Sequence, residues 1–446
     1  MLLRLTLLVL FGATLAACST QEVKYAHSVP LVAAPASLAE DELLDVAVVI
    51  FNSGVPDGEI DRELLEELMR DGTFVNIRRA EAMYMAVNLS ETLRKSGHWG
   101  SVWVTPRDST ALDLNVRAEI LQSDGNVVEL HVVAQDATGR VWLNQEYDME
   151  TAASSYNRQR YPGIDPYQDV FNEIANDLAA LRAGMGAEDI AQIRTIGELR
   201  YASELIPEAF GDYLEQSGDG IYEPVRLPAI GDPMLQRMRS VRQREQLFFE
   251  TLDQNYDNFA LQASDSYDGW REYSREDSIR AKEAARAAKL RTGLGALAIA
   301  LSIAYGQDAD NNSLADAIVR DAGIYIGGDL LRSAATRRQE RRLHTQSLQE
   351  LAESFDDDVK PLVVEVQGTQ YRLTGTADAQ FQEWQGLLRQ LFISETGFVP
   401  DDIDVFIEPD PEPEVETIPP AAANPGTESE SEEATPDASG GTAAQV

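Results

Sequence analysis

Residues 112–147 read LDLNVRAEIL-Q-SDGN-VVELHVVAQ-DATG-RVWLNQEY, and this segment determines the predicted architecture. Strand-like runs at 112–121, 127–135 and 140–147 are separated by the turns Ser-Asp-Gly-Asn and Asp-Ala-Thr-Gly. Asp-Gly and Gly supply a positive φ at low cost, and turns this short join antiparallel neighbours. The segment therefore predicts three consecutive strands of an antiparallel meander.

The residues before this meander add two strands and two helices to it. The apolar run 45–51 suits a buried strand, and 59–70 and 76–96 carry apolar residues at helical spacing. A further strand is expected at 101–105. A sheet of this kind buries one face against helices, so residues 44–150 are predicted to form an α/β domain with a mainly antiparallel sheet.

The next region, 151–233, is predicted to combine helices and linkers. The segment 156–166 is polar and contains two prolines, and 218–233 contains three, so both are expected to be irregular connectors. Apolar spacing broken by glycine and proline indicates helices at 166–182, 187–202 and 207–216.

The region 234–358 is predicted to hold the longest helix. From 234 to 291 there is no proline and one glycine, Gly269, and apolar residues recur at a spacing of about 3.5. This pattern indicates a long amphipathic helix that bends at Gly269 or takes part in a coiled coil. The apolar stretch 290–305 continues it, and a second helix at 314–355 would return as the other arm of a helical hairpin.

The C-terminal part divides into a small folded region and a tail. Within 359–400, strands at 362–367 and 370–374 are expected to form a β-hairpin, followed by a helix at 377–395. Residues 401–446 contain 13 acids and no Lys or Arg, a composition that buries too little apolar surface to fold and predicts disorder. The chain as a whole is therefore predicted to be α+β.

The N-terminus carries the features of an exported protein. Arg4 precedes an apolar run at 5–17. At about 1.5 Å per residue this run is too short to cross a hydrocarbon core of about 30 Å. Residues 1–17 are therefore predicted to be a cleaved signal peptide.

The motif Leu15–Cys18, Leu-Ala-Ala-Cys, resembles the lipobox of bacterial lipoproteins, and Cys18 is the only cysteine of the chain. The resemblance implies that Cys18 becomes the first residue and carries a covalent diacylglyceryl group and an N-acyl chain such as palmitate. Two or three acyl chains anchor a protein stably, because each buried methylene contributes about 0.8 kcal/mol. Residues 18–43 are then expected to be a lipidated tether. Ser19 and Thr20 imply sorting to the periplasmic side of the outer membrane.

The order of strands and helices in 44–150 is similar to that of envelope lipoprotein domains of the CsgG and TolB N-terminal kind. The similarity is one of pattern, and no diagnostic motif accompanies it. It implies a small α/β domain of the cell envelope and assigns no functional residue to this chain.

Composition excludes several classes of function. A net charge of -38 repels phosphate backbones, so no nucleic acid partner is expected. One cysteine and four dispersed histidines leave no metal site of the zinc type. Nucleophile-elbow, zinc-protease and phosphate-loop motifs are all lacking. We therefore expect a protein that is not an enzyme and has no cofactor, no metal and no small-molecule substrate.

Two groups of basic residues stand out on this acidic chain. The predicted hairpin would place the two groups at similar positions along its two antiparallel helices. Together they would form a basic collar that contacts phospholipid headgroups or an acidic partner. The alternative is a buried hairpin whose arginines pair with the surplus acids. The candidate residues are Arg280, Lys282, Arg286, Lys289, Arg291, Arg332, Arg337, Arg338, Arg341 and Arg342.

Three functions fit these features. The first is a lipid-anchored, non-catalytic envelope protein, an adaptor or assembly factor that binds other envelope proteins. The second is an accessory subunit of an export or secretion machine whose 290–330 hairpin contacts a membrane. The third is a cell-wall hydrolase.

Overall fold

The computed structural model of the chain describes residues 26–35, 38–56, 60–70, 73–304, 346–347, 350, 362–366 and 369–398. For residues 69–70, 281, 284–304, 365–366 and 369 it describes the helix or strand and not the side chains. The predicted signal peptide, Cys18, most of the second hairpin arm and the acidic tail lie outside the described residues. The described part confirms the α+β class and belongs to one compact unit of the chain.

A mixed five-stranded sheet forms the centre, in the order β2-β1-β3-β4-β5. Its strands are β1 (Val46–Val49), β2 (Val102–Thr105), β3 (Leu114–Ser123), β4 (Val127–Asp136) and β5 (Val141–Glu150). The meander β3-β4-β5 is antiparallel, as predicted, and supplies the long ladders. The short strand β1 runs parallel to both of its neighbours, β2 and β3, and all four of its residues are buried.

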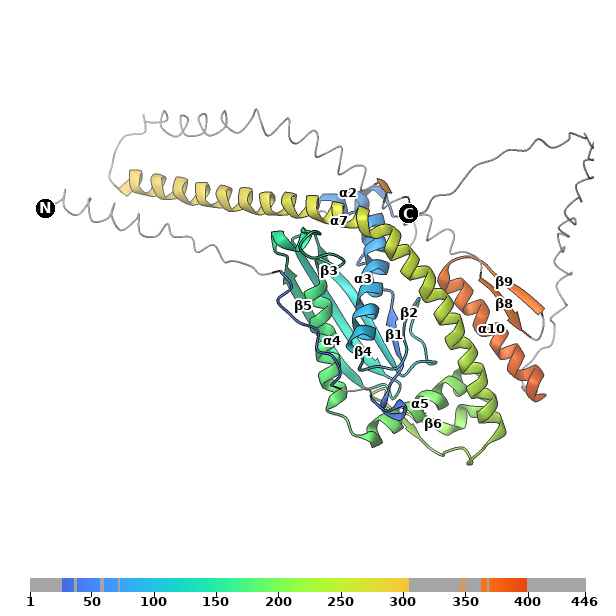
Figure 1. Ribbon diagram of the computed structural model, residues 1–446. Coiled ribbons are helices and arrows are strands. Elements are labelled where there is room, and N and C mark those ends of the chain that lie inside the picture. The colour runs from blue at the N-terminus through green and yellow to red at the C-terminus, as the bar shows by residue number, and fades with distance from the viewer. Residues whose placement is uncertain are drawn as a thin grey trace, which may run out of the picture. The chain divides into compact units, whose positions relative to one another are not determined.

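One face of the sheet is covered by α3 (Val75–Ser96) and α4 (Gln168–Ala183), which lie side by side in front of the strands in Figure 1. Residues of β4 alternate between buried and half-buried, so the other face is partly open to solvent. A short helix, α2 (Arg62–Arg70), precedes α3. Helix α3 ends where the sequence predicts, because Gly97 adopts the left-handed conformation with φ 70°.

The longest element is α7 (Pro233–Ala304), a continuous helix of 72 residues, about 108 Å long. Its first half runs along the free edge of β2, where the backbone N–H of Val104 donates to Asp253 over 2.8 Å. This contact satisfies an edge group that would otherwise be open to pairing. The helix continues through Gly269 and changes direction between its two halves (Figure 1).

Residues 207–216, predicted as one helix, are divided among three elements. Only α6 (Pro207–Phe210) is α-helical, after α5 (Ala187–Leu205), and a 3-10 turn at Gly211–Tyr213 follows. Residues 214–216 form β6 (Leu214–Gln216), which pairs with β7 (Tyr222–Pro224). The helix prediction is wrong here because the hairpin docks on the sheet: the N–H of Tyr222 donates to the carbonyl of Thr138 over 2.8 Å. Tertiary contact thus overrides local propensity.

The C-terminal elements are those predicted: β8 (Leu362–Val366), β9 (Thr369–Leu373) and α10 (Ala377–Thr396). Helix α10 packs on α7 through an aromatic cluster in which Phe248 stacks on Trp384 at 5.7 Å and Phe249 lies 5.4 Å from Phe381. The apolar seam of the first half of α7 is therefore covered by this chain's own elements.

Among the described residues, no helix combines the length and hydrophobicity that crossing a bilayer requires.

Candidate functional site

The second half of α7 is held to the body by a buried ion pair. The Arg271 side chain is 1% exposed, and its two terminal nitrogens donate to the two oxygens of Asp165 over 2.9 and 2.7 Å. Asp268, one helical turn earlier on α7, also pairs with Arg271. Such a bidentate pair fixes both position and orientation.

Three tyrosines enclose this guanidinium. The Arg271 Cζ lies 4.1 Å from the ring centroid of Tyr267, 4.7 Å from that of Tyr167 and 5.5 Å from that of Tyr84. The Tyr84 hydroxyl also donates to Asp165 over 3.0 Å. Buried cation–π contacts of this kind add to the ion pair. We call Arg271, Asp165, Asp268 and the three tyrosines the α7 joint.

The charges at the joint are matched. Burial by itself would raise the pKa of Asp165, but the Arg271 guanidinium outweighs that effect and holds this pKa below its usual value. Burial would likewise lower the pKa of Arg271, and Asp165 and its neighbours hold it well above the ordinary value. Both groups are therefore ionised over the physiological pH range, as a buried ion pair requires.

A second carboxyl lies beneath the joint. Glu81 of α3 accepts hydrogen bonds from the hydroxyls of Tyr267 and Ser123, each over 2.7 Å, and pairs with Arg78 at 3.0 Å. Burial nevertheless raises the pKa of Glu81 above its usual value. These contacts tie α7, α3 and the end of β3 into one polar network.

The backbone approaches α7 closely at Gly125, in the β3–β4 turn. This residue has φ 77°, and a Cβ placed on it would overlap the main-chain carbonyl of Arg271. Its N–H donates to the Tyr167 hydroxyl over 3.0 Å, and its carbonyl accepts from the Tyr156 hydroxyl over 2.6 Å. Only glycine combines this conformation with this approach.

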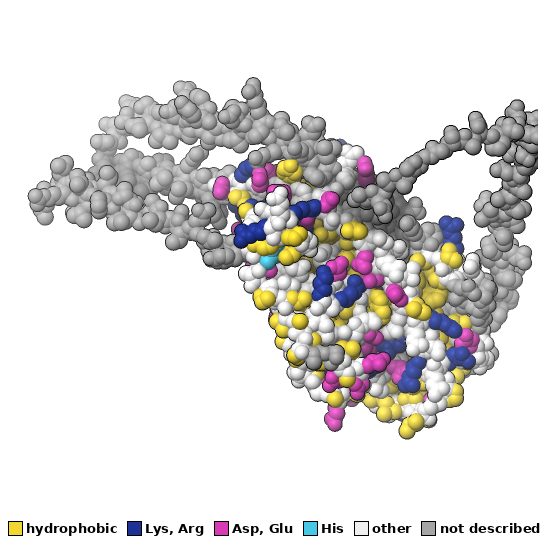
Figure 2. Space-filling model, in the orientation of Figure 1, with side chains coloured by type: hydrophobic (Ala, Val, Ile, Leu, Met, Phe, Trp, Pro, Cys, Tyr) yellow, Lys and Arg dark blue, Asp and Glu magenta, His cyan; other side chains and the backbone are white. Residues whose placement is uncertain are grey.

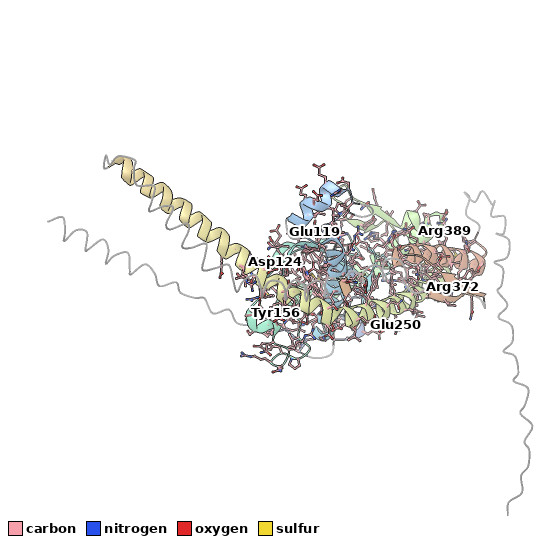
Figure 3. All side chains as sticks on the ribbon, turned by 90° about the horizontal axis from the view of Figure 1, so that it is seen from above. Glu119, Asp124, Tyr156, Glu250, Arg372 and Arg389 are labelled. Atoms are coloured by element: carbon pink, nitrogen blue, oxygen red, sulfur yellow. The ribbon has the colours of Figure 1, made fainter. Side chains whose placement is uncertain are left out.

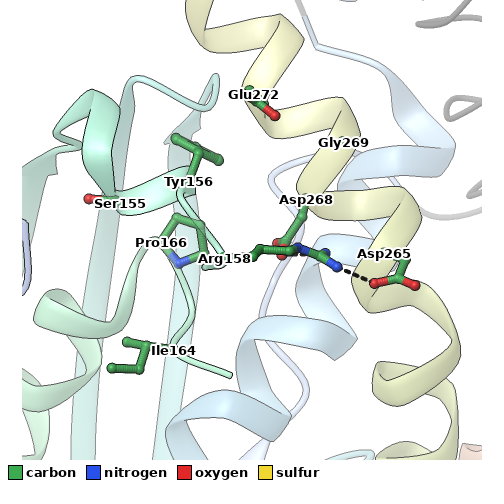
Figure 4. Close-up of a pocket in the computed structure, with 9 residues that line it drawn as sticks. All are labelled: Ser155, Tyr156, Arg158, Ile164, Pro166, Asp265, Asp268, Gly269 and Glu272. Carbon is green, nitrogen blue, oxygen red and sulfur yellow. Dashed lines mark hydrogen bonds and ion pairs between the residues drawn. The ribbon is translucent and has the colours of Figure 1, made fainter. Parts of the chain in front are cut away.

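A cavity of about 150 Å³ opens beside the joint (Figure 4). Arg158 crosses it to form ion pairs with Asp265 and with Asp268, the latter at 2.7 Å. No group of three His, Cys, Asp or Glu side chains that could hold a metal occurs among the described residues. The cavity is lined by Ser155, Tyr156, Arg158, Ile164, Pro166, Asp265, Asp268, Gly269 and Glu272.

Part of the predicted tether is bound to the body. Residues 26–35, which we call the strap, lie along α4. Asp169 accepts hydrogen bonds from the N–H of Ser28 over 2.7 Å and from its hydroxyl over 3.2 Å. Asn172 donates to the carbonyl of Val29, and Asn176 donates to the carbonyl of Pro30 and accepts from the N–H of Val32, over 2.8 to 3.0 Å. The spacing of Asp169, Asn172 and Asn176 places their side chains on one face of α4. Because the strap is bound there, fewer residues of the predicted tether are free.

The strap enters the body at the same end as the joint. The ring of His27 meets that of Tyr161 edge-on at 4.6 Å, and Nδ1 of His27 lies 3.9 Å from Asp169. Tyr161 belongs to the segment predicted as a linker, which also supplies Asp165 to the joint. In Figure 1 the first described residues, dark blue, lie on the side from which the yellow half of α7 leaves.

The predicted basic collar is only partly described. Arg280 pairs with Glu276 at 2.8 Å and with Asp277 at 3.8 Å, and Lys282 lies 3.9 Å from Asp124. These two cations therefore meet acids of their own chain. Arg286, Lys289 and Arg291 lie on α7 without described side chains, whereas Cys18, Arg332, Arg337, Arg338, Arg341 and Arg342 lie outside the described residues.

A second cavity, of about 190 Å³, lies between α5 and α10. Glu245 of α7 is fully buried near it, beside Tyr201 and Gln385, and neither of its carboxyl oxygens has a hydrogen-bond partner within the described part of the chain. Burial raises the pKa of Glu245 to about 7, Glu204 adds to this effect, and Arg242 opposes it. Its charge therefore changes near neutral pH. The cavity is lined by Thr110, Tyr201, Glu204, Leu205, Gln385, Gly386 and Arg389.

We expect Glu245→Gln to stabilise the protein at pH 8. Because the pKa of Glu245 is higher in the folded state, its favourable contribution is complete below about 4.5 and is lost as the pH rises through about 7. The glutamine should therefore raise the free energy of unfolding at pH 8 by on the order of 3 kcal/mol relative to pH 4.5. Urea unfolding at both pH values tests this, with Glu250→Gln, at an exposed position of the same helix, as control. Equal pH dependence in wild type and Glu245→Gln would contradict it.

No pattern in the sequence indicates the joint. Arg271 looks like one more basic residue on a long amphipathic helix, and Asp165 lies in a segment that looks like a polar linker. The sequence predicts Gly125 correctly as a turn glycine. The hairpin turn by itself is a sufficient reason for a glycine at this position. No local pattern indicates that a turn glycine also faces a helix from another part of the chain.

No protein-family model, no curated protein and no solved structure matches this chain.

Proposed function

We propose that this protein is a lipid-anchored, non-catalytic adaptor or assembly factor of the cell envelope, held at the periplasmic face of the outer membrane. The observation that best supports this is the joint, which fixes a long helix rigidly to a compact body. Residues 272–304 of α7, which we call the arm, extend about 50 Å beyond Arg271. A projecting helix with a fixed base is suited to binding another protein.

The base of the arm contacts the β3–β4 turn, where the Ser278 hydroxyl donates to Asp124 over 2.7 Å and Lys282 lies 3.9 Å from the same carboxylate. Elements that pack on α7 are β2, α3, α5 and α10, which meet its first half or the joint. Figures 1 and 3 view the arm from two directions, and in both it extends past the other described helices and strands. Such a helix is not needed to complete the core, so a function in binding accounts for it better.

The anchor and the arm would share one end of the body. Eight residue steps separate Cys18 from the start of the strap, a reach of at most about 28 Å. The lipid on Cys18 would therefore keep the joint close to the membrane, and the arm is longer than that reach. This arrangement supports an adaptor that captures a partner at the membrane surface.

Photo-crosslinking in intact cells tests the adaptor function. We expect a photoreactive residue in place of Glu283, exposed on the arm, to capture a specific envelope protein. The same residue in place of Glu250, exposed on the packed half of α7, should not capture it. Identical products from the two positions, or no protein product from the arm, would contradict the adaptor function.

The second candidate, an accessory subunit of an export machine, is favoured by the composition of the arm. Leu290–Ala304 is the most apolar internal stretch. Arg286 and Lys289 lie just before it, and Arg291 is its second residue. This order suits contact with headgroups and acyl chains. Crosslinks from the arm to lipid rather than to protein would favour this candidate.

A further inference from the structure

A second surface at the anchored end has a composition unlike that of the chain as a whole. Residues 157–164, Asn-Arg-Gln-Arg-Tyr-Pro-Gly-Ile, form an exposed loop that we call the exit loop. It contains two arginines and no acid, whereas the chain has 75 acids and 37 basic residues. Ile164 is 39% exposed although it is a large aliphatic residue. The loop therefore presents cationic and apolar groups together.

The exit loop is ordered and attached at both sides. The backbone N–H of Arg160 donates to the side chain of Asn157 over 3.0 Å, and its guanidinium lies 5.3 Å from the ring centroid of Tyr161. Arg158 is tied to α7 by Asp265 and Asp268. The loop thus holds a defined shape beside the joint.

The strap brings the exit loop to the anchor. Tyr161 contacts His27, the second described residue of the strap, with ring centroids 4.6 Å apart. A lipid on Cys18 lies at most about 28 Å from residue 26 along an extended chain. Among the described segments, the exit loop is the one that touches the strap at its entry and carries both arginine and exposed apolar side chains.

We propose that the exit loop docks on the lipid bilayer that holds Cys18. This inference rests on the proposed lipid anchor. Arg160, which makes no ion pair within the described residues, contacts headgroup phosphates, and Tyr161, Pro162 and Ile164 enter the interfacial layer. Arg158 orients the loop, because its charge is already met by Asp265 and Asp268. The acidic remainder of the body is then repelled from an anionic surface, which favours this one orientation.

The test uses the mature full-length chain in vesicles of phosphatidylglycerol and phosphatidylethanolamine with a lipid-borne quencher. An environment-sensitive dye is placed on Ile164→Cys, and on the fully exposed Ile230→Cys as control. Ile230 precedes the start of α7 at Pro233, and α7 measures about 57 Å along its axis from Pro233 to Arg271. Docking predicts strong quenching at position 164 and little at 230. Equal, weak quenching at both positions in protein that floats with the vesicles would overturn the inference.

Charge variants test the chemistry of the contact. Arg160→Glu removes one positive charge and adds one negative charge, which should lower the ratio of docked to undocked loop about thirtyfold. Arg140→Glu, at another exposed arginine, in the β4–β5 turn, should leave quenching at 164 unchanged. Equal effects of the two variants would argue against headgroup contact.

Two outcomes separate this inference from the anchor on which it rests. If Cys18 carries lipid, its sulfur is blocked and the dye enters only at position 164. Labelling at two positions, or protein that does not float, would refute the anchor itself. The dye signal at 164 could instead change in native envelopes but not in protein-free vesicles. That result would mean that the exit loop binds a protein and not the bilayer, and it would overturn the inference.

Discussion

Replacing Arg271 by methionine is expected to lower the free energy of unfolding by about 3–5 kcal/mol. Methionine keeps much of the packing against the three tyrosine rings, but it leaves the carboxylate of Asp165 buried without its cation. An uncompensated buried charge is among the few defects that cost this much. Urea unfolding followed by tryptophan fluorescence measures the effect.

Two further variants separate charge from packing at the joint. Arg280→Met, on the same helix, breaks a half-exposed pair with Glu276 and should cost no more than about 1 kcal/mol. Combining Arg271→Met with Asp165→Asn removes the unpaired charge and should restore much of the loss. The joint would lose its assigned importance if Arg271→Met cost no more than Arg280→Met.

The same joint can be opened from the opposite side, through the β3–β4 turn. Gly125→Ala introduces a Cβ that overlaps the main chain of α7, whereas Gly163→Ala meets nothing within 4 Å at a similar φ of 70°. Both variants carry the left-handed backbone strain of about 1–2 kcal/mol. The excess cost of Gly125→Ala, about 1–3 kcal/mol, measures the close approach alone.

The meander shows how much of the fold local sequence determines. Strands β3, β4 and β5 lie where alternating apolar residues and the two glycine turns predict them. Helix α7 runs through the proline-free stretch, and α10 forms where a helix is predicted and buries Phe381, Trp384, Leu388 and Leu391. These elements are specified by periodicity and turn chemistry, which a single segment contains.

Features that depend on distant residues could not be predicted in this way. Arg271 and Asp165 are 106 residues apart, and the strap meets α4 across more than 140 residues. A polar segment bound through its main chain looks the same in sequence as a free linker, because the bound groups are backbone atoms. Residues 214–216 likewise pair as a strand only because their hairpin docks on the β4–β5 turn, where the N–H of Tyr222 donates to the carbonyl of Thr138.

The other large effect expected is the loss of membrane attachment in Cys18→Ser. A serine cannot take the thioether-linked diacylglyceryl group, which in our proposal is what holds the chain at the membrane. After a wash at high salt, which weakens contacts of the exit loop and the arm with headgroups, the variant should leave the membrane fraction. Ser19→Ala, a neighbouring substitution that keeps the thiol, should remain membrane-bound.

The most direct test of the account is the mass of the N-terminal peptide of the mature protein, isolated from its native envelope. Our account predicts a peptide that begins at Cys18 and carries a diacylglyceryl group on sulfur together with an acyl chain on nitrogen. A peptide that contains an unmodified Cys18, or a mature chain that begins elsewhere, would contradict it.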